Sequence, residues 1–261
     1  MKSSITKTAG AAAVALLALS GAASAEDRQF GWSVNVGGTS DYIFRGVSQT
    51  DGDPAFQAGV DFSYGILYAG IWGSNTDDAF TNSSAEIDFY AGIKPVLGPV
   101  TFDFGVIYYS YPGANPDSVL LPDLNYVELK AGYSWSALHP SLVTGTTVFW
   151  SPDYVLETGS VWTIETMAAW TLPKVHIFTP VINGVLGWQK GDANDNYFVN
   201  INGTDEEYYY WNAGLNVAVE NISFDFRYWD TNIGGDAGGF ICAADFLCDE
   251  RFVFSAKVAV P

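Results

Sequence analysis

The chain has 261 residues, enough for one large domain or two small ones, and a formal net charge of −18 from 29 acidic and 11 basic residues. This balance argues against nucleic acid as a partner, because phosphate binding needs clustered lysine and arginine. Aromatic residues make up 16% of the chain, which excludes an acidic disordered protein, and two cysteines exclude a disulfide-dense scaffold or a four-cysteine zinc site.

Residues 1–25 have the pattern of a signal peptide. Lys2 and Lys7 give a basic start, and the apolar run 9–19 is too short to span a bilayer. The small residues 23–25 predict cleavage between Ala25 and Glu26. We therefore expect an exported protein with one mature domain, residues 26–261. Its 29 acidic and nine basic residues give a net charge of −20.

Apolar and polar residues alternate with period two from about residue 31 to the C-terminus. In 100–108, for example, Phe102, Phe104 and Val106 share one face while Asp103 lies on the other. Such alternation is typical of β-strands with two different faces. It predicts twelve strands, at roughly 31–45, 54–64, 66–75, 84–95, 99–111, 124–135, 141–151, 159–171, 175–189, 206–219, 221–231 and 250–260.

Short and long connections alternate between these strands. The short ones lie near 64–65, 96–98, 136–140, 172–174 and 220–221. The long polar ones lie near 46–53, 76–83, 112–123, 152–158, 190–205 and 232–249. An even strand count, with turns at one end and loops at the other, is the pattern of an outer-membrane barrel. We predict an all-β fold, a single antiparallel transmembrane β-barrel with both chain ends on the periplasmic side.

A secreted soluble β-sandwich or lipocalin-like barrel is the alternative, since it also alternates with period two. Aromatic residues near the strand ends favour the membrane barrel, where they form girdles at the two lipid interfaces. The candidates for these girdles are Tyr108, Tyr133, Trp135, Trp162, Trp170, Tyr209 and Trp211.

Charged residues lie in mid-strand on the polar faces, which point into the lumen of such a barrel. The predicted lumen-facing acids are Asp61, Glu86, Asp88, Asp103, Glu128, Glu165 and Asp225, and the bases are Arg45, Lys94, Lys130, Arg227, Arg251 and Lys257. Charges away from water must be paired, and otherwise they must be hydrated. These residues therefore fit either a wet pore with charged walls or a salt-bridged interior that holds the barrel shut.

The stretch 37–75 closely resembles the opening of the TorF-like porin family of proteobacteria, which is also known as a conserved exported protein of unknown function. The matching residues include Ser40-Asp41-Tyr42, Phe44-Arg45-Gly46, Ser48-Gln49-Thr50, Asp53-Pro54-Ala55 and Trp72-Gly73-Ser74-Asn75. A second match covers Trp229-Asp230-Thr231 and Cys248-Asp249-Glu250-Arg251. The resemblance implies an exported outer-membrane protein, and it brings no catalytic residues. The last predicted strand departs from barrels of this kind by ending in Val260-Pro261 rather than in an aromatic residue.

Metal and enzyme chemistry find little support in the remaining motifs. Asp51 to Pro54 and the run 192–203 suggest calcium. An EF-hand loop starting at Asp192 would need glycine at its sixth position and glutamate at its twelfth, but the sequence has Tyr197 and Gly203 there. We expect no metal site and no cofactor. His139 and His176 lie at the predicted periplasmic end without a Gly-x-Ser-x-Gly turn, so we expect no enzyme.

Cys242 and Cys248 both lie within the last long connection. An oxidising compartment favours pairing of the two thiols, so we predict a disulfide between them. Two reduced, buried thiols are the alternative.

These observations predict a passive channel for small hydrophilic solutes in a Gram-negative outer membrane, in contact with lipid and lipopolysaccharide. A non-conducting barrel with a structural or adhesive role is the first alternative, and an outer-membrane enzyme is the second. A preference for cations is expected because the long loops and their edges carry eighteen acids against one base, Lys190. The acids are Asp51, Asp53, Asp77, Asp78, Asp117, Asp123, Asp153, Glu157, Asp192, Asp195, Asp205, Glu206, Glu207, Asp230, Asp236, Asp245, Asp249 and Glu250.

Overall fold

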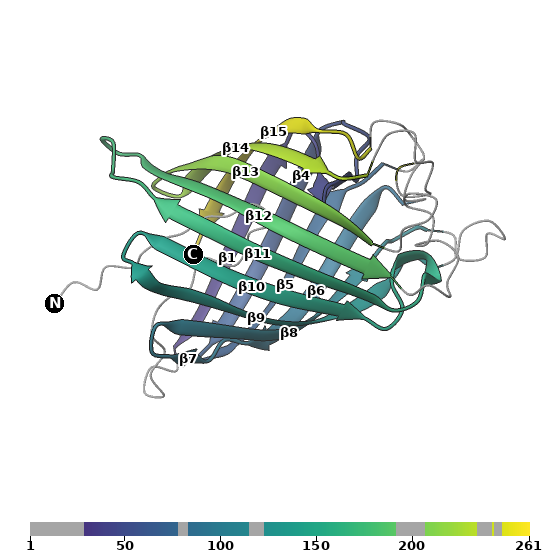
Figure 1. Ribbon diagram of the computed structural model, residues 1–261, viewed down its shortest axis with the longest axis horizontal. Helices are drawn as coiled ribbons and strands as arrows, with labels where there is room; N and C mark the ends of the chain where they lie inside the picture. The colour runs from purple at the N-terminus through teal and green to yellow at the C-terminus, as the bar shows by residue number, and fades with distance from the viewer. Residues whose placement is uncertain (1–28, 78–82, 115–122, 192–206, 234–241, 243–246) are drawn as a thin grey trace.

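A computed structural model describes residues 29–77, 83–114, 123–191, 207–233, 242 and 247–261, and in it twelve long strands close into an antiparallel β-barrel (Figure 1). The predicted fold class is therefore confirmed. The strands of the barrel are β1 (Phe30–Thr39), β4 (Ala55–Tyr64), β5 (Leu67–Asn75), β6 (Ala85–Ile93), β8 (Val100–Ser110), β9 (Tyr126–His139), β10 (Leu142–Ser151), β11 (Val161–Thr171), β12 (Thr179–Gly191), β13 (Glu207–Val219), β14 (Ile222–Thr231) and β15 (Arg251–Val260).

Each strand of the barrel pairs with its neighbours in the chain, and β1 pairs with β15 to close the cylinder. Val34 lies opposite Val260 in that closing pair. Phe30 at the start of β1 lies opposite Tyr64, beside the tight turn after β4, and Figure 1 shows the C-terminus at this same end. The longer connections, such as residues 40–54, join the strands at the other end. We call these the turn end and the loop end. Three two-residue strands complete the sheets: β2 (Ile43–Phe44), β3 (Val47–Ser48) and β7 (Val96–Leu97).

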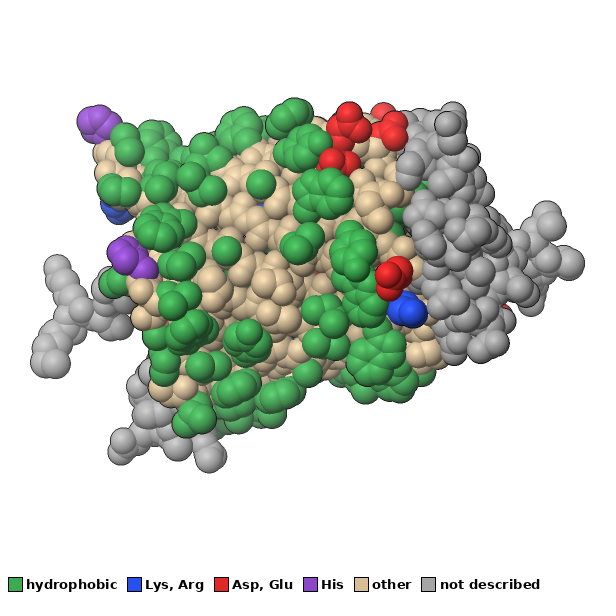
Figure 2. Space-filling model, viewed as in Figure 1, with side chains coloured by type: hydrophobic (Ala, Val, Ile, Leu, Met, Phe, Trp, Pro, Cys, Tyr) green, Lys and Arg blue, Asp and Glu red, His purple; other side chains and the backbone are tan. Residues whose placement is uncertain are grey.

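The outer wall is apolar because the outward face of each strand carries the hydrophobic half of the alternating pattern. Phe104 and Leu129 are exposed on this wall, whereas Asp103 and Glu128 beside them are buried inside. Figure 2 shows hydrophobic side chains over the barrel wall. Five of the predicted girdle residues are exposed large aromatics: Tyr108, Tyr133, Trp162, Trp170 and Tyr209. Trp135 and Trp211 are partly exposed.

Three strand ends differ from the prediction. Strand β1 stops at Thr39 rather than at residue 45, because the following segment turns into the barrel. Strand β12 begins at Thr179 rather than at 175, since Val175 and Phe178 close a tight turn in which His176 has a φ of 54°. Strand β9 continues to His139.

The predicted signal peptide and its cleavage site lie outside the described residues. No helix in the described part of the chain is both long and apolar enough to cross a membrane. The connection after β10 contains one turn of 3-10 helix, η1 (Val155–Glu157).

Candidate functional site

The connection between β1 and β4, residues 40–54, folds back into the lumen at the loop end. Its centre is the small antiparallel pair β2–β3, in which Ile43 lies opposite Ser48 and Phe44 opposite Val47. Arg45 (φ 51°) and Gly46 (φ 86°) form the turn. We call residues 40–54 the inner hairpin. Its central residues are buried, whereas residues 51–54 are exposed, so it occupies the lumen rather than the outer surface.

Arg45 at the tip of the inner hairpin forms a buried ion pair with Glu128 on β9. Its Nη1 and Nη2 atoms donate to the two carboxylate oxygens at 2.7 and 2.9 Å, and the two side chains are 3% and 1% exposed. The Tyr109 hydroxyl donates to the same carboxylate at 3.0 Å. The guanidinium also lies over the Phe149 ring, 4.9 Å from its centroid. A bidentate pair with these added partners meets the condition under which a buried charge is tolerated.

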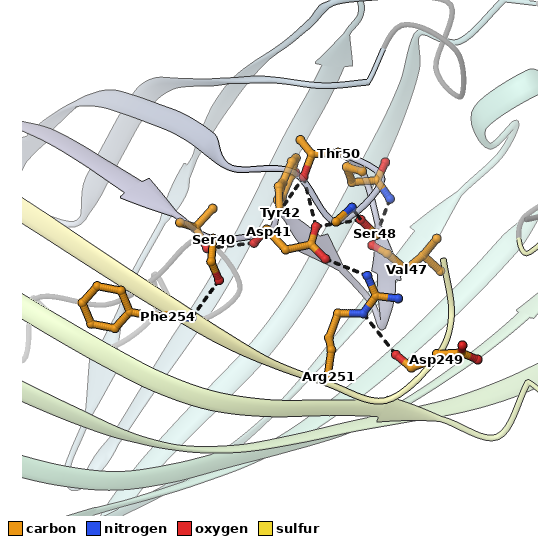
Figure 3. Close-up of polar contacts among 12 residues, drawn as sticks. Ser40, Asp41, Tyr42, Val47, Ser48, Thr50, Asp249, Arg251 and Phe254 are labelled. Carbon is orange, nitrogen blue, oxygen red and sulfur yellow. Dashed lines mark hydrogen bonds and ion pairs between the residues drawn. The ribbon is translucent and has the colours of Figure 1, made fainter. Parts of the chain in front are cut away.

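Asp41 organises the base of the inner hairpin (Figure 3). One carboxylate oxygen accepts hydrogen bonds from the hydroxyls of Ser48 at 2.6 Å and Thr50 at 3.0 Å. The other oxygen accepts from Nη1 of Arg251 on β15 at 2.7 Å. The two stretches that carry the family resemblance therefore meet in space, because closure of the barrel brings β1 beside β15.

A second carboxylate on the wall receives the hairpin through Tyr42. The Tyr42 hydroxyl donates to Glu86 on β6 at 2.8 Å, and its ring packs edge-on against Trp72 on β5. Burial, and then the nearby Glu86 charge, raise the pKa of Tyr42, so the phenol stays protonated and remains a donor.

Apolar and aromatic side chains fill the lumen around the inner hairpin. They come from the loop-end residues of many strands and from the loops above them. The cluster contains Ile43, Val47, Tyr109, Tyr111, Leu124, Tyr126, Tyr154, Leu156, Val161, Tyr208, Tyr210, Trp229, Ile233, Cys242, Leu247, Cys248 and Val253. We call this the outer cluster. Together with the inner hairpin it occupies the loop end of the lumen.

Cys242 and Cys248 form the predicted disulfide, with their Cα atoms 5.7 Å apart. Both cysteines are buried in the outer cluster. The adjoining backbone contacts the hairpin and the wall: the Leu247 carbonyl accepts from the Ser48 amide at 2.9 Å, and the Cys248 carbonyl accepts from the Thr231 hydroxyl at 3.2 Å. Leu247, next to the crosslinked Cys248, therefore lies against the inner hairpin.

Towards the turn end the wall is polar, and several tyrosines lie flat along it. The Tyr90 ring on β6 crosses Gly70 on β5, and its hydroxyl donates to Asp61 on β4 at 2.6 Å. Nearer the loop end, Tyr210 on β13 likewise lies across Gly187 of β12 and donates to Glu165 on β11 at 2.6 Å. A Cβ atom at Gly70 would overlap the Tyr90 ring. The glycines therefore let large side chains lie against the wall.

Twelve of the thirteen predicted charges come from the inward side of the barrel strands or from the residue just beyond one. Asp103 pairs with Lys130 at 3.0 Å and lies 3.8 Å from Lys94. Asp225 pairs with Arg227 at 2.9 Å on the same strand, and Asn183 and Asn212 accept from the same guanidinium. Asp88, Glu86 and Asp225 are buried, while Asp61, Glu165 and Lys257 are partly exposed.

Among these predicted charges, the position of Arg45 was predicted wrongly. The sequence interpretation placed it on the wall in strand 31–45, whereas it belongs to the inner hairpin and reaches Glu128 from within the lumen. The physical reason is Asp41: its buried carboxylate needs the Ser48 and Thr50 hydroxyls and Arg251, and a turn after Thr39 brings the hydroxyls to it.

Asp41 and the inward tyrosines were missing from the predicted site. The available signal was the dense polar motif of Asp41, Ser48 and Thr50 within one connection. In an ordinary surface loop these side chains would face solvent. Tyr208 and Tyr210 were assigned to a strand. Period two alone does not reveal that these two rings meet aromatic rings from other strands.

The acids at the loop end and the histidines at the turn end are separated along the barrel (Figure 2). The described loop-end acids are Asp51, Asp53, Asp77, Asp123, Asp153, Glu157, Glu207, Asp230, Asp249 and Glu250, and the other eight predicted acids lie outside the described residues. Partial burial and the charges of Asp77 and Asp53 raise the pKa of Asp51. His139 stacks on Trp170 at 4.9 Å between ring centroids, and its Nδ1 accepts from the Ser141 amide.

No group of three histidine, cysteine, aspartate or glutamate residues with metal-site geometry occurs within the described residues. The run 192–203, considered above for calcium, lies outside them.

Comparison with solved structures finds a shared fold in the NanC porin. The NanC porin has a TM-score of 0.52 at 10% identity, with 88% of this chain and 100% of that chain covered. The outer membrane channel DcaP of Acinetobacter baumannii gives 0.43 at 10% identity, with coverage of 90% and 97%, and LpxR from Salmonella typhimurium gives 0.42 at 7%, with coverage of 87% and 99%. At these identities the likeness shows the fold alone.

Sequence comparison with curated proteins gives no match. The family model described as "Bacterial protein of unknown function (Gcw_chp)" matches residues 22–259. The chain therefore belongs to the Gcw_chp family of bacterial proteins.

Proposed function

We propose that this protein is an outer-membrane channel for small hydrophilic solutes, closed at its loop end by the inner hairpin. The observation that carries the proposal is the division of the lumen into two parts. The part near the turn end has a polar, charged and partly exposed wall, whereas the part near the loop end is filled by the inner hairpin and the outer cluster. The resemblance to TorF-like porins supports the same function.

The inner hairpin is held mainly by polar contacts at its tip and base. Arg45 binds Glu128 on β9, Tyr42 binds Glu86 on β6, and Asp41 binds Arg251 on β15. Water can replace each of these partners if the hairpin swings outward, so opening does not require breaking the barrel wall. In the proposed mechanism, solutes diffuse through the polar lumen when the hairpin leaves it, and pore width and wall charge select among them.

Single-channel recording in planar bilayers tests this proposal. Wild-type protein is expected to conduct rarely, and Glu128→Gln is expected to open more often because it leaves the buried Arg45 charge without its counterion. Asp225→Asn is the matched control: it also breaks a buried ion pair, but that pair belongs to the wall and does not contact the hairpin.

More frequent opening in Glu128→Gln than in Asp225→Asn supports the channel and its closure by the hairpin. If neither wild type nor Glu128→Gln conducts, although both form folded barrels, the channel proposal is wrong. The second candidate function, a non-conducting barrel with a structural or adhesive role, is favoured by the same filled loop end and would then take its place.

Cation preference is a finer part of the proposal. Ten of the described acids lie at the loop end, and Asp51, Asp53 and Glu157 among them are exposed. Their field concentrates cations at the outer mouth. The same acids can bridge through divalent cations to anionic lipopolysaccharide, and the apolar wall would contact the lipid.

A further inference from the structure

Two lysines converge on one carboxylate near the turn end of the lumen. Lys94 follows the last residue of β6, Lys130 lies on β9, and Asp103 lies on β8 between these strands. The Asp103 side chain is 4% exposed, whereas Lys94 and Lys130 are 25% and 11% exposed. The two lysine side chains are therefore partly exposed.

Asp103 holds Lys130 more closely than it holds Lys94. One carboxylate oxygen accepts from the Tyr68 hydroxyl at 2.7 Å, and the other accepts from Lys130 at 3.0 Å. Lys94 lies 3.8 Å from that second oxygen, beyond hydrogen-bond distance. Both lysines also lie over the Tyr68 ring, with Nζ atoms 4.7 and 5.3 Å from its centroid. Their ammonium groups thus face the same small region.

The lumen arginines are arranged differently. Arg45, Arg227 and Arg251 each donate to a carboxylate at 2.7 to 2.9 Å. Their pairs are one to one and serve the hairpin or the wall. The lysine group differs: Asp61 also attracts Lys94, and it attracts Lys257 on β15. Three lysines, Lys94, Lys130 and Lys257, therefore face two carboxylates, Asp103 and Asp61, which leaves one net positive charge in a chain whose overall charge is −18.

We infer that Lys94 and Lys130 form a binding site for a small oxyanion, either a carboxylate or a phosphate group. An ammonium acts as a compact point charge with three rotatable donors, and two of them beside a solvent-filled lumen hold an oxyanion without needing a planar fork. Tyr68 is a positioning residue, because its ring lies under both Nζ atoms, and Asp103 competes with the oxyanion for them. Binding needs only entry from the turn end, so the site does not depend on whether the loop end opens.

Isothermal titration of the purified barrel in a non-ionic detergent at low salt tests the site, with acetate and inorganic phosphate as separate probes. Lys94→Gln is expected to weaken binding of the preferred probe by about tenfold, since it removes a unit charge from a partly buried site. Lys174→Gln is the matched control, because Lys174 is exposed in the turn between β11 and β12, and it should bind as wild type does.

Asp103→Asn is expected to change the affinity for the probe in the opposite direction, and this distinguishes a change in the binding site from damage to the fold. Loss of the competing carboxylate should tighten binding of the probe several-fold, whereas damage to the wall would weaken it. The inference is overturned if neither probe binds, if Lys94→Gln and Lys174→Gln behave alike, or if Asp103→Asn weakens binding while the barrel remains folded. Conductance is not part of this readout, so failure of the channel proposal would leave the result interpretable.

Discussion

Arg45 and Glu128 are 83 positions apart in the chain, yet they form a bidentate ion pair across the interior of the barrel. Arg45 follows β1, and Glu128 lies on β9, five strands farther round the sheet. The pair therefore ties the inner hairpin to the wall remote from its own strand. This contact fixes the position of the hairpin and, with it, the closed loop end.

Removing one member of this pair should destabilise the protein more than removing both. Glu128→Gln is expected to lower the free energy of unfolding by about 3 kcal/mol, because it leaves a buried, uncompensated guanidinium. The double variant Arg45→Met with Glu128→Met should lose less than the sum of the single variants. Guanidinium chloride unfolding measures the losses of the two single variants and of the double variant. Additive losses would show that the two side chains do not depend on each other.

Two glycines of the inner hairpin give a matched test of its docking. Gly46 and Gly52 both have a positive φ, but a Cβ at Gly46 would overlap Thr231 and meet Tyr210, whereas a Cβ at Gly52 meets nothing within 4 Å. Gly52→Ala should cost only about 1 kcal/mol of backbone strain. Gly46→Ala should also displace the hairpin, which would raise proteolytic cleavage within residues 40–54. Equal cleavage of the two variants would contradict the docked position.

The disulfide should order the cover of the lumen rather than hold the barrel together. Loop-closure entropy for so short a loop contributes about 2 kcal/mol at most. The Leu247 carbonyl contacts the inner hairpin, and the Cys248 carbonyl contacts the wall. The double variant Cys242→Ser with Cys248→Ser is therefore expected to increase channel opening with little change in barrel unfolding. Thiol labelling of denatured, unreduced wild type should find no free cysteine, and two reactive thiols would refute the bond.

An open channel should prefer cations at low salt. The loop-end acids set a negative potential whose reach shortens to about 10 Å at 0.1 M salt, so the preference should fade as salt rises. Reversal potentials of Glu128→Gln across a potassium chloride gradient measure this. A chloride preference at low salt would show instead that the lysines near the turn end control selectivity.

The apolar outer wall predicts extraction with outer membranes. The protein should fractionate there, show β-type circular dichroism in detergent, and migrate differently on gels with and without boiling. Recovery of folded protein in the soluble periplasmic fraction would contradict the placement.

The barrel itself was predictable because its determinants are local. Alternation in segments such as 100–108 fixes which side chains face outward, and a slip of one residue would place Asp103 on the apolar outer wall. Tight turns at residues such as Gly65 and Gly98 joined the strands in order. These features repeat along the chain and need no knowledge of distant partners.

The closed lumen depended on contacts that only the tertiary structure creates. Arg45 was assigned to the lumen from its face in an extended strand, but its partner Glu128 and the inward turn after Thr39 could not be found by period two. Asp41 meets Arg251 over 210 positions because the first and last strands close the barrel. Sequence alone therefore determined a barrel with a charged interior. It did not decide between a wet pore and a salt-bridged interior. Only the folded chain decided that Arg45 pairs with Glu128 and Asp41 with Arg251 inside the lumen, since pairing of buried charges depends on positions set by all twelve strands together.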